Sequence, residues 1–205
     1  MEKFYLEEAN IKRKLEAIEY IKEHIKYNSE PAGVGGLDDE YKNYEKWLEK
    51  IELMKNIETC PSNRCIGREY FLIRESDEKI VGMINLRWNL DEWMMNYGGN
   101  IGYGIRPTER RKGYNKINLY LCLLKAKQFG IKKVLLTAND DNLGSINTIK
   151  ALGGVLENKI ESYKENEDIL GRYWIDVDES LEKYESVYKK KILIKEWYNG
   201  NYRSK

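Results

Sequence analysis

The chain has 205 residues, of which 41% are hydrophobic and 34% charged, and its formal net charge is +1. These values are typical of one globular domain, with or without an appendage, and they argue against a basic surface for nucleic acid. The sequence has neither a run of about 18 apolar residues nor a secretory signal, so we expect a cytoplasmic protein with no membrane partner.

Cysteine and histidine usage offers no metal or nucleophile motif. Cys60 and Cys65 have no second Cys or His pair near them, so a zinc site is not expected. The single histidine, His24, lies in a helical pattern, where a structural role is usual. We therefore expect no metal cofactor and no Cys–His catalysis.

Helical spacing dominates the first 65 residues. Through residues 3–28, apolar positions recur near helical spacing at Ile11, Leu15, Ile18 and Ile25. A glycine-rich loop follows at 31–36, and then Asp38 or Asp39 can cap a second helix. We expect two helices here, separated by that loop.

Alternating patterns then predict an antiparallel meander. Its strands fall at 69–74, 79–87 and 99–106, with a connection at 89–97. Pro107 has no N–H to donate and disfavours helix at the residue before it, so the third strand ends there.

The last strand of the meander opens a strand–helix–strand unit. The helix expected at 115–129 is apolar nearly all round, which is typical of a helix buried against a sheet. A short apolar strand follows at 131–138, then a second helix that stops at Gly153-Gly154. Residues 155–163 and 171–177 read as a hairpin.

Residues 178–205 carry mixed signals, with helical spacing near 181–188 and a strand-like run near 192–197. Two interpretations stay open. This appendage packs on the domain, or it contacts a second subunit in a homodimer.

The segment between the third strand and the apolar helix is the most informative one. It reads Arg110-Arg-Lys-Gly-Tyr-Asn115, and with Lys116 it brings four cations and a glycine to a helix N-terminus. Such a point binds phosphate through backbone N–H groups. The P-loop pattern is absent, and the glycines at 98–104 precede and occupy a strand, unlike a dinucleotide fingerprint. A solvated basic turn is the remaining alternative.

With these motifs the chain resembles the Gcn5-related N-acetyltransferase (GNAT) superfamily. The segment 110–115 resembles the family's acetyl-CoA motif, [Q/R]-x-x-G-x-[G/A], and Asn142-Leu-Gly-Ser145 resembles its second hallmark, Asn-x-x-[Ala/Ser]. Gly98-Gly99 and Arg172-Tyr-Trp further resemble a bacterial subgroup of acetyltransferases predicted from sequence. The resemblance covers roughly residues 66–177. It implies an α/β (α+β) fold with a mixed, mostly antiparallel central sheet, splayed strands four and five, and helices on both faces.

The resemblance also implies acetyl-CoA as co-substrate and direct transfer of its acetyl group to a primary amine of a small molecule or peptide. Residues 1–177 would be the acetyltransferase domain, with 1–65 as a cap on the acceptor side and 178–205 as the appendage. The CoA contacts that it implies are Ile105, Arg106, Arg110, Arg111, Lys112, Gly113, Tyr114, Asn115, Asn142 and Ser145.

Two positions depart from the family pattern. Asn115 stands where Gly or Ala is usual, and Ile149 stands where many members carry a tyrosine general acid. The candidates for a replacement proton donor are Ser145, Tyr163 and Tyr173, of which we prefer Ser145 and Tyr173. The candidate base is a carboxylate such as Glu92, or a chain of water molecules.

Three classes of function therefore compete. The first is an N-acetyltransferase, and the second is an inactive CoA-binding or partner-binding module on the same fold, motivated by Ile149. The third, RNA contact through residues 110–116, is disfavoured by the near-zero net charge, so we expect no nucleic-acid partner. The acidic run 38–40 would suit a cationic amine acceptor.

Overall fold

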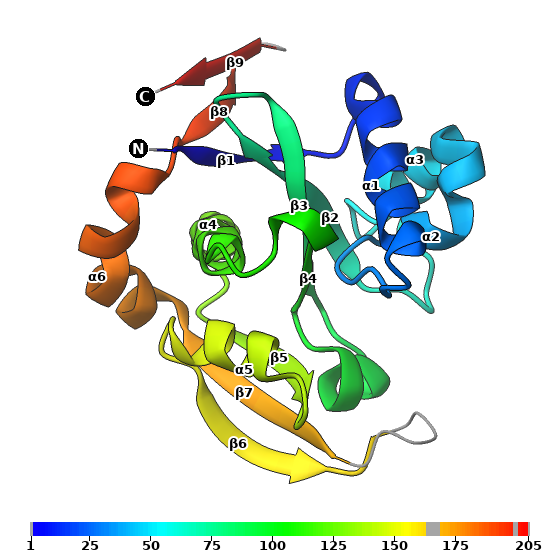
Figure 1. The fold of residues 1–205 in the computed structure, drawn as a ribbon. Coiled ribbons are helices and arrows are strands. Elements are labelled where there is room, and N and C mark those ends of the chain that lie inside the picture. The colour runs from blue at the N-terminus through cyan, green and yellow to red at the C-terminus, as the bar shows by residue number, and fades with distance from the viewer. Residues whose placement is uncertain (1, 163–168, 199–200, 205) are drawn as a thin grey trace.

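The computed structural model describes residues 2–162, 169–198 and 201–204 (Figure 1). Four strands form an antiparallel sheet in the order β1-β2-β3-β4. Their bounds are β1 Phe4–Glu8, β2 Ile66–Arg74, β3 Lys79–Trp88 and β4 Ile101–Ile105. The predicted three-stranded meander is confirmed as β2 to β4, and β1 is added along its outer edge.

Strand β1 is a correction, because the prediction of helix from residue 3 onward is wrong there. Phe4–Glu8 pairs with β2, and helix α1 begins only at Lys14. Phe4 and Leu6 point into one hydrophobic core and Tyr5 into the other. A strand buried on both faces shows no alternation of hydrophobic and polar residues, so the period-two signal is missing from the sequence.

Helices cover both faces of this sheet (Figure 1). On one face lie α1 (Lys14–Lys26), α2 (Leu37–Glu40) and α3 (Tyr44–Leu53), and on the other lies α4 (Tyr114–Gln128). One hydrophobic core fills the space under α1 to α3, and a second surrounds α4. Helix α4 contacts the sheet on one side and α6 on another, which explains its nearly continuous apolar surface.

The start of the second helical segment differs from the prediction of an aspartate cap. Helix α2 is a single turn that follows Gly36, whose φ is 81°, and α3 begins at Tyr44. Asn43 caps α3 by accepting a hydrogen bond from the Lys46 N–H at 3.3 Å. Shorter turns complete this inventory: 3-10 segments at Ile11–Arg13, Tyr41–Asn43, Pro107–Glu109 and Lys189–Lys191, and a π-helical turn at Met94–Gly98.

A second sheet has the order β5-β7-β6. Its strands are β5 Lys133–Asn139, β6 Val155–Ile160 and β7 Leu170–Asp176, and α5 (Leu143–Lys150) packs between it and α4. The predicted strand–helix–strand unit and the hairpin are both present.

The C-terminal residues contact the same domain. Helix α6 (Val177–Tyr188) packs on α4, where the rings of Tyr120 and Tyr188 stack with centroids 4.7 Å apart. Ile192 forms a parallel bridge with Phe4 of β1, and a hairpin of β8 (Lys195–Tyr198) and β9 (Asn201–Ser204) follows. Within the described ranges, no helix has the length and apolar character that a membrane span requires.

Strands β4 and β5 touch at one point and then diverge. The Asn100 N–H donates to the Leu135 carbonyl, and the Leu135 N–H donates to Asn100 Oδ1, both at 2.7 Å. A Cβ on Gly99 would lie 2.5 Å from the Leu135 oxygen, so glycine is needed for this approach. Beyond it, β4 ends one sheet and β5 ends the other, so each strand presents an open edge to the gap between them. The fold class is as expected, including the splayed strands.

Candidate active site

The open edge of β4 presents backbone groups of alternate residues. The Arg106 N–H and the Asn100 carbonyl both hydrogen-bond to β3, at 2.9 and 2.7 Å. Because these groups alternate along a strand, the odd-numbered residues Ile101, Tyr103 and Ile105 direct theirs away from β3 and into the gap. An extended ligand arm could therefore pair with β4 as an added strand does.

The turn after β4 leaves a row of backbone N–H groups free. Arg111 and Gly113 adopt left-handed conformations with φ of 62° and 79°, and α4 begins at the next residue, Tyr114. In the described part of the chain, the N–H groups of residues 111–115 have no hydrogen-bond partner. They lie at a helix N-terminus, so the turn has the geometry and the partial charge of a phosphate site.

The cations of this turn divide into two kinds. Arg110 donates to the Ile105 carbonyl at 3.1 Å and to a serine hydroxyl, and Lys112 pairs with Glu109 at 2.8 Å. The side chains of Arg111 and Lys116 have no ion pair or hydrogen bond with any described residue. Arg111 and Lys116 are thus the cations available to an incoming anion, whereas the other two support the turn.

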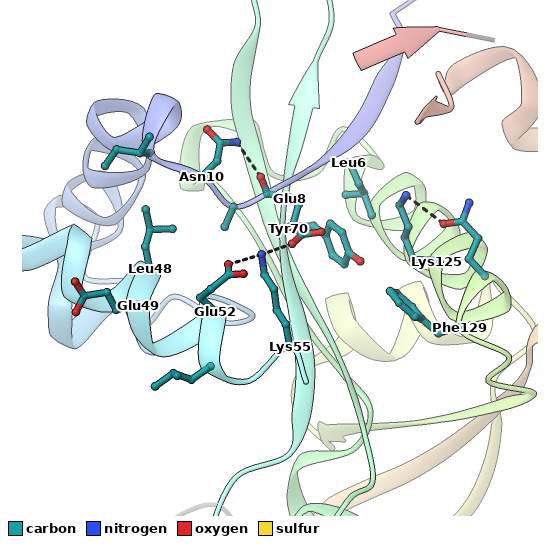
Figure 2. Close-up of a pocket in the computed structure, with 14 residues that line it drawn as sticks. Leu6, Glu8, Asn10, Leu48, Glu49, Glu52, Lys55, Tyr70, Lys125 and Phe129 are labelled. Carbon is teal, nitrogen blue, oxygen red and sulfur yellow. Dashed lines mark hydrogen bonds and ion pairs between the residues drawn. The ribbon is translucent and has the colours of Figure 1, made fainter. Parts of the chain in front are cut away.

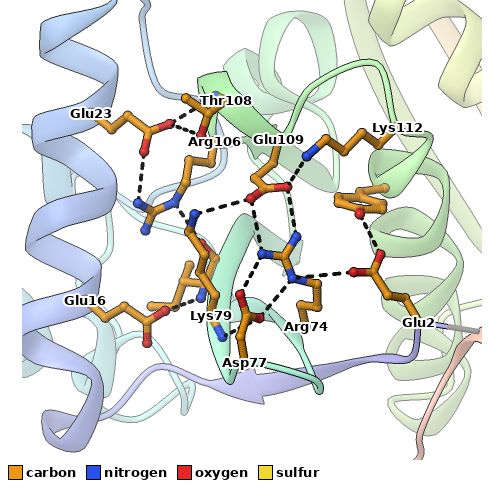
Figure 3. A network of polar contacts seen from close by, with 12 residues as sticks. Glu2, Glu16, Glu23, Arg74, Asp77, Lys79, Arg106, Thr108, Glu109 and Lys112 are labelled. Carbon is orange, nitrogen blue, oxygen red and sulfur yellow. Dashed lines mark hydrogen bonds and ion pairs between the residues drawn. The ribbon is translucent and has the colours of Figure 1, made fainter.

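A buried carboxylate anchors the turn from below (Figure 3). Glu109, whose side chain is 6% exposed, accepts hydrogen bonds from Arg74, Lys79 and Lys112 at 2.9, 3.2 and 2.8 Å. Burial alone would raise the pKa of Glu109, but the hydrogen bonds from Lys112, Arg74 and Lys79 lower it to about 2. The carboxylate is therefore charged at all physiological pH values and ties the turn to β2 and β3.

Arg106 belongs to the same support (Figure 3). Its guanidinium pairs with Glu23 of α1 at 3.0 Å and donates to the Ile80 carbonyl at 2.9 Å. Since its N–H is also bonded within the sheet, Arg106 directs no polar group into the gap. The CoA contact predicted for Arg106 stays a prediction, because the guanidinium and the N–H of this residue both bind within the protein.

A pair of hydroxyl groups joins β4 to α5 beside the gap between β4 and β5. Tyr103 extends from β4 and its hydroxyl lies 2.8 Å from Ser145 Oγ. Asn142 caps α5 by accepting the Ser145 N–H at 3.0 Å. Burial raises the pKa of Tyr103, so its hydroxyl stays protonated at neutral pH. Tyr103 could not be identified from the sequence, because only the fold brings it to Ser145.

A model of the acetyltransferase (GNAT) family matches residues 36–154, which is more than half of the chain. The chain belongs to the GNAT family. It is accordingly an acetyltransferase, as its motifs indicated. A search of curated proteins finds no match to this GNAT chain.

Solved structures share the GNAT fold at low sequence identity. Ribosomal-protein-S5-alanine acetyltransferase from Vibrio fischeri is 14% identical over 87% of this chain and 95% of its own, with a TM-score of 0.66. Mycobacterium smegmatis RimJ in complex with CoA-disulfide is 11% identical over 91% and 92%, with a TM-score of 0.68. A dodecameric spermidine N-acetyltransferase from Vibrio cholerae is 12% identical over 88% and 98%, with a TM-score of 0.62.

Among the described residues, the other candidates of this GNAT domain form no hydrogen bond with the hydroxyl pair. Tyr173 is buried in the hydrophobic core around α4, with its ring against Gly171. Glu92 is exposed, and Tyr163 lies outside the described residues. Ile149 is fully buried against Gly154, so the family's usual acid position is a core position here. Of the described proton-donor candidates, only Ser145 forms a hydrogen bond with a side chain of β4.

A large hollow of the molecule is separate from this site (Figure 2). It has a volume of about 990 Å³ and lies at the β1 edge of the sheet, between α3 and the C-terminal end of α4. Lys55 crosses it and pairs with Glu8 and Glu52.

In the described ranges, no group of three or more His, Cys, Asp or Glu residues is arranged to hold a metal ion.

Proposed function

We propose that this GNAT protein transfers the acetyl group of acetyl-CoA directly to a primary amine of a small molecule or peptide. One observation carries the proposal: the open edge of β4 runs directly into the free N–H groups of residues 111–115. A pyrophosphate and an extended pantetheine arm need these two features in this order. RimJ, which has the same fold, was solved with CoA-disulfide.

In this proposal the pyrophosphate binds at the turn. The N–H groups of residues 111–115 donate to its oxygens, and Arg111 and Lys116 supply positive charge. Gly113 has no atom within 4 Å of the position where a Cβ would lie, so a phosphate can approach the backbone there. Arg110 and Lys112 act indirectly, by holding the turn.

The pantetheine arm then lies between β4 and β5. It pairs with the outward-facing groups of Ile105 and Tyr103, and the amide of Asn142 contacts it from α5. An N–H of this edge also donates to the thioester carbonyl and stabilises the negative charge that develops on its oxygen.

Departure of the thiolate is assisted by the hydroxyl pair. When Tyr103 donates to Ser145 Oγ, the serine proton is free to point at the sulfur. Ser145 is then the proton donor and Tyr103 positions it. Tyr173 remains a second candidate donor, although it is buried in the core.

A thiol-release assay with acetyl-CoA and a panel of primary amines tests this function. We expect CoA release that requires an amine and yields the acetylated amine by mass spectrometry. Acetyl-CoA binding without release for any amine would instead favour the CoA-binding module.

A further inference from the structure

A second pocket lies on the opposite face of β4 from the hydroxyl pair. Its volume is about 360 Å³, the size of a small-molecule site. It is bounded by β2, β3, the loop before β2 and the connection between β3 and β4. The charged residues that line it are Arg64, Glu69, Arg87 and Asp91.

Two of these charged groups lie deep in the pocket, on the sheet itself. Glu69 of β2 stands directly opposite Asn85 of β3, and Asn85 stands opposite Gly102 of β4. Asn85 Oδ1 accepts the Gly102 N–H at 2.9 Å. Glu69 alternates with Phe71, which packs under α1 to α3, so its carboxyl points to the cap face of the sheet.

Two residues that line the pocket, Asn85 and Arg87, contact Gly102 of β4, one residue before Tyr103. A Cβ on Gly102 would lie 3.6 Å from a terminal nitrogen of Arg87, so the guanidinium lies over the strand. The next residue, Tyr103, turns its side chain to the other face and its backbone groups to the gap. An amine in this pocket and a thioester in the gap would meet across the edge of β4.

Arg87 is incompletely paired in this pocket. A terminal nitrogen donates to the Gly98 carbonyl at 3.0 Å, but its buried Nε–H has no partner among the described residues. Glu69 and Arg87 do not form an ion pair within the described chain, although they are diagonal neighbours on adjacent strands. A buried cation that lacks a counter-charge favours the binding of an anion.

We propose that this pocket binds the acceptor, and that the acceptor is a small zwitterion whose amine faces Glu69 and whose acidic group faces Arg87. The inference rests on the proposed function and specifies its substrate class. Diagonal positions on adjacent strands have backbones about 7–8 Å apart, so the Glu69 and Arg87 side chains on one face can both contact one small molecule. An α- or β-amino acid carries an ammonium group and a carboxylate within one such molecule.

The electrostatics of the pocket favour a zwitterion over a plain amine. Burial raises the pKa of Glu69 to about 8, despite the Arg87 charge and a hydrogen bond with Asn85. Near neutral pH Glu69 is therefore mostly protonated and leaves Arg87 uncompensated. A carboxylate from the acceptor compensates Arg87, and its ammonium group favours the ionised form of Glu69.

The proton balance of the reaction then assigns Glu69 a catalytic role. The ammonium group gives one proton to the Glu69 carboxylate, and the free amine forms the C–N bond with the thioester carbon. The C–S bond breaks with its electron pair on sulfur. The second proton leaves nitrogen and reaches sulfur through the Ser145 hydroxyl, and Glu69 releases its proton to water.

Matched acceptors test the substrate class by thiol release with acetyl-CoA. The pairs are β-alanine with ethylamine, and phenylalanine with 2-phenylethylamine, which differ only in the carboxylate. We expect kcat/KM to be at least about 30-fold higher for the acids, and Arg87→Met to remove most of that preference, because the variant loses the charge-paired hydrogen bonds.

Equal rates for acids and amines would overturn the inference, and so would acetylation of neither while acetyl-CoA binds. Failure of acetyl-CoA to bind at all would overturn the proposed function, and this inference with it. Thermal melting of Arg87→Met checks that the variant is folded.

The role of Glu69 has a separate readout in the pH profile. We expect kcat/KM of the wild type to fall below pH 8, with a midpoint that stays fixed for acceptors whose amine pKa values differ. Glu69→Gln should remove that dependence and lower kcat/KM by about 10²- to 10⁴-fold.

The other charged or titratable groups that line the pocket are Arg87 on β3, Arg64 and Cys65 before β2, and Asp91 after β3. Only a thiol among these types ordinarily titrates near pH 8, so Cys65→Ser is the control and should keep the dependence. A profile that persists in Glu69→Gln, or that vanishes in Cys65→Ser, would refute the role of Glu69.

Discussion

The buried carboxylate of Glu109 gives the sharpest prediction about stability. Its pKa lies at about 2, against an ordinary value of 4.5, and its side chain is only 6% exposed, so solvent screens it little. A difference of this size corresponds to about 3 kcal/mol of folding free energy at neutral pH. Glu109→Gln removes the charge, so we expect it to lower the free energy of unfolding by about 3 kcal/mol at pH 7.

The same linkage fixes the pH dependence. A carboxylate whose pKa is lowered on folding stabilises the folded protein at pH values above its unfolded pKa. That stabilisation is lost as pH falls through the folded pKa. The difference between the wild type and Glu109→Gln should therefore shrink between about pH 5 and pH 2. Urea denaturation of both proteins at several pH values measures this.

Asp77 supplies a matched control for Glu109. It pairs with the same Arg74 at 2.7 Å, but its side chain is 44% exposed. We expect Asp77→Asn to cost less than about 1 kcal/mol, as exposed ion pairs do. A Glu109→Gln penalty below about 1 kcal/mol, or one that is equal at pH 7 and pH 3, would refute the assignment of the buried charge.

Three further predictions concern the site. Ser145→Ala and Tyr103→Phe should each lower kcat by about 10- to 100-fold without changing acetyl-CoA affinity. The kcat of the double variant should be no lower than that of either single variant, because the two hydroxyls act as a unit. Additive losses in kcat would argue against the pair. Arg111→Ala and Lys116→Ala should each weaken acetyl-CoA binding by about tenfold in calorimetry at low salt, with a smaller effect at high salt; insensitivity to salt would argue against phosphate contact. Burial of Glu69 favours its protonated form, so the free energy of unfolding of the wild type should fall as pH rises through about 8. In urea denaturation, Glu69→Gln should therefore become more stable relative to the wild type between pH 5 and pH 9. A stability difference that stays constant with pH would place the carboxyl in solvent.

Local motifs account for what the sequence could predict. The turn at 110–115 and the cap at 142–145 are each contiguous, so both could be located from residue order alone. The meander, the buried helix α4 and the β6–β7 hairpin were likewise predicted from periodicity and turn residues. The extra strand β1 was missed because both of its faces are buried.

The acceptor side could not be predicted in the same way. Glu69 and Arg87 belong to different strands, and only the register of β2 and β3 brings them to one pocket. Glu69 did leave one signal, because it occupies an inward position in step with Phe71 and Ile73. A carboxylate at a core-facing strand position is costly without a role. Tyr103 left no such signal, since its partner Ser145 is 42 residues away in the chain.

Calorimetric titration of acetyl-CoA into two glycine variants tests the central claim, that the turn at 110–115 binds CoA. Gly113 and Gly130 lie at opposite ends of α4, with φ of 79° and 73°, and neither has an atom within 4 Å of its Cβ position. Tryptophan at either position therefore carries similar backbone strain, but only at Gly113 would it fill the phosphate site. We predict that Gly130→Trp binds as the wild type does and that Gly113→Trp binds at least about 30-fold more weakly, a loss of about 2 kcal/mol. Equal affinities for the two variants, or no binding to the wild type, would contradict the account.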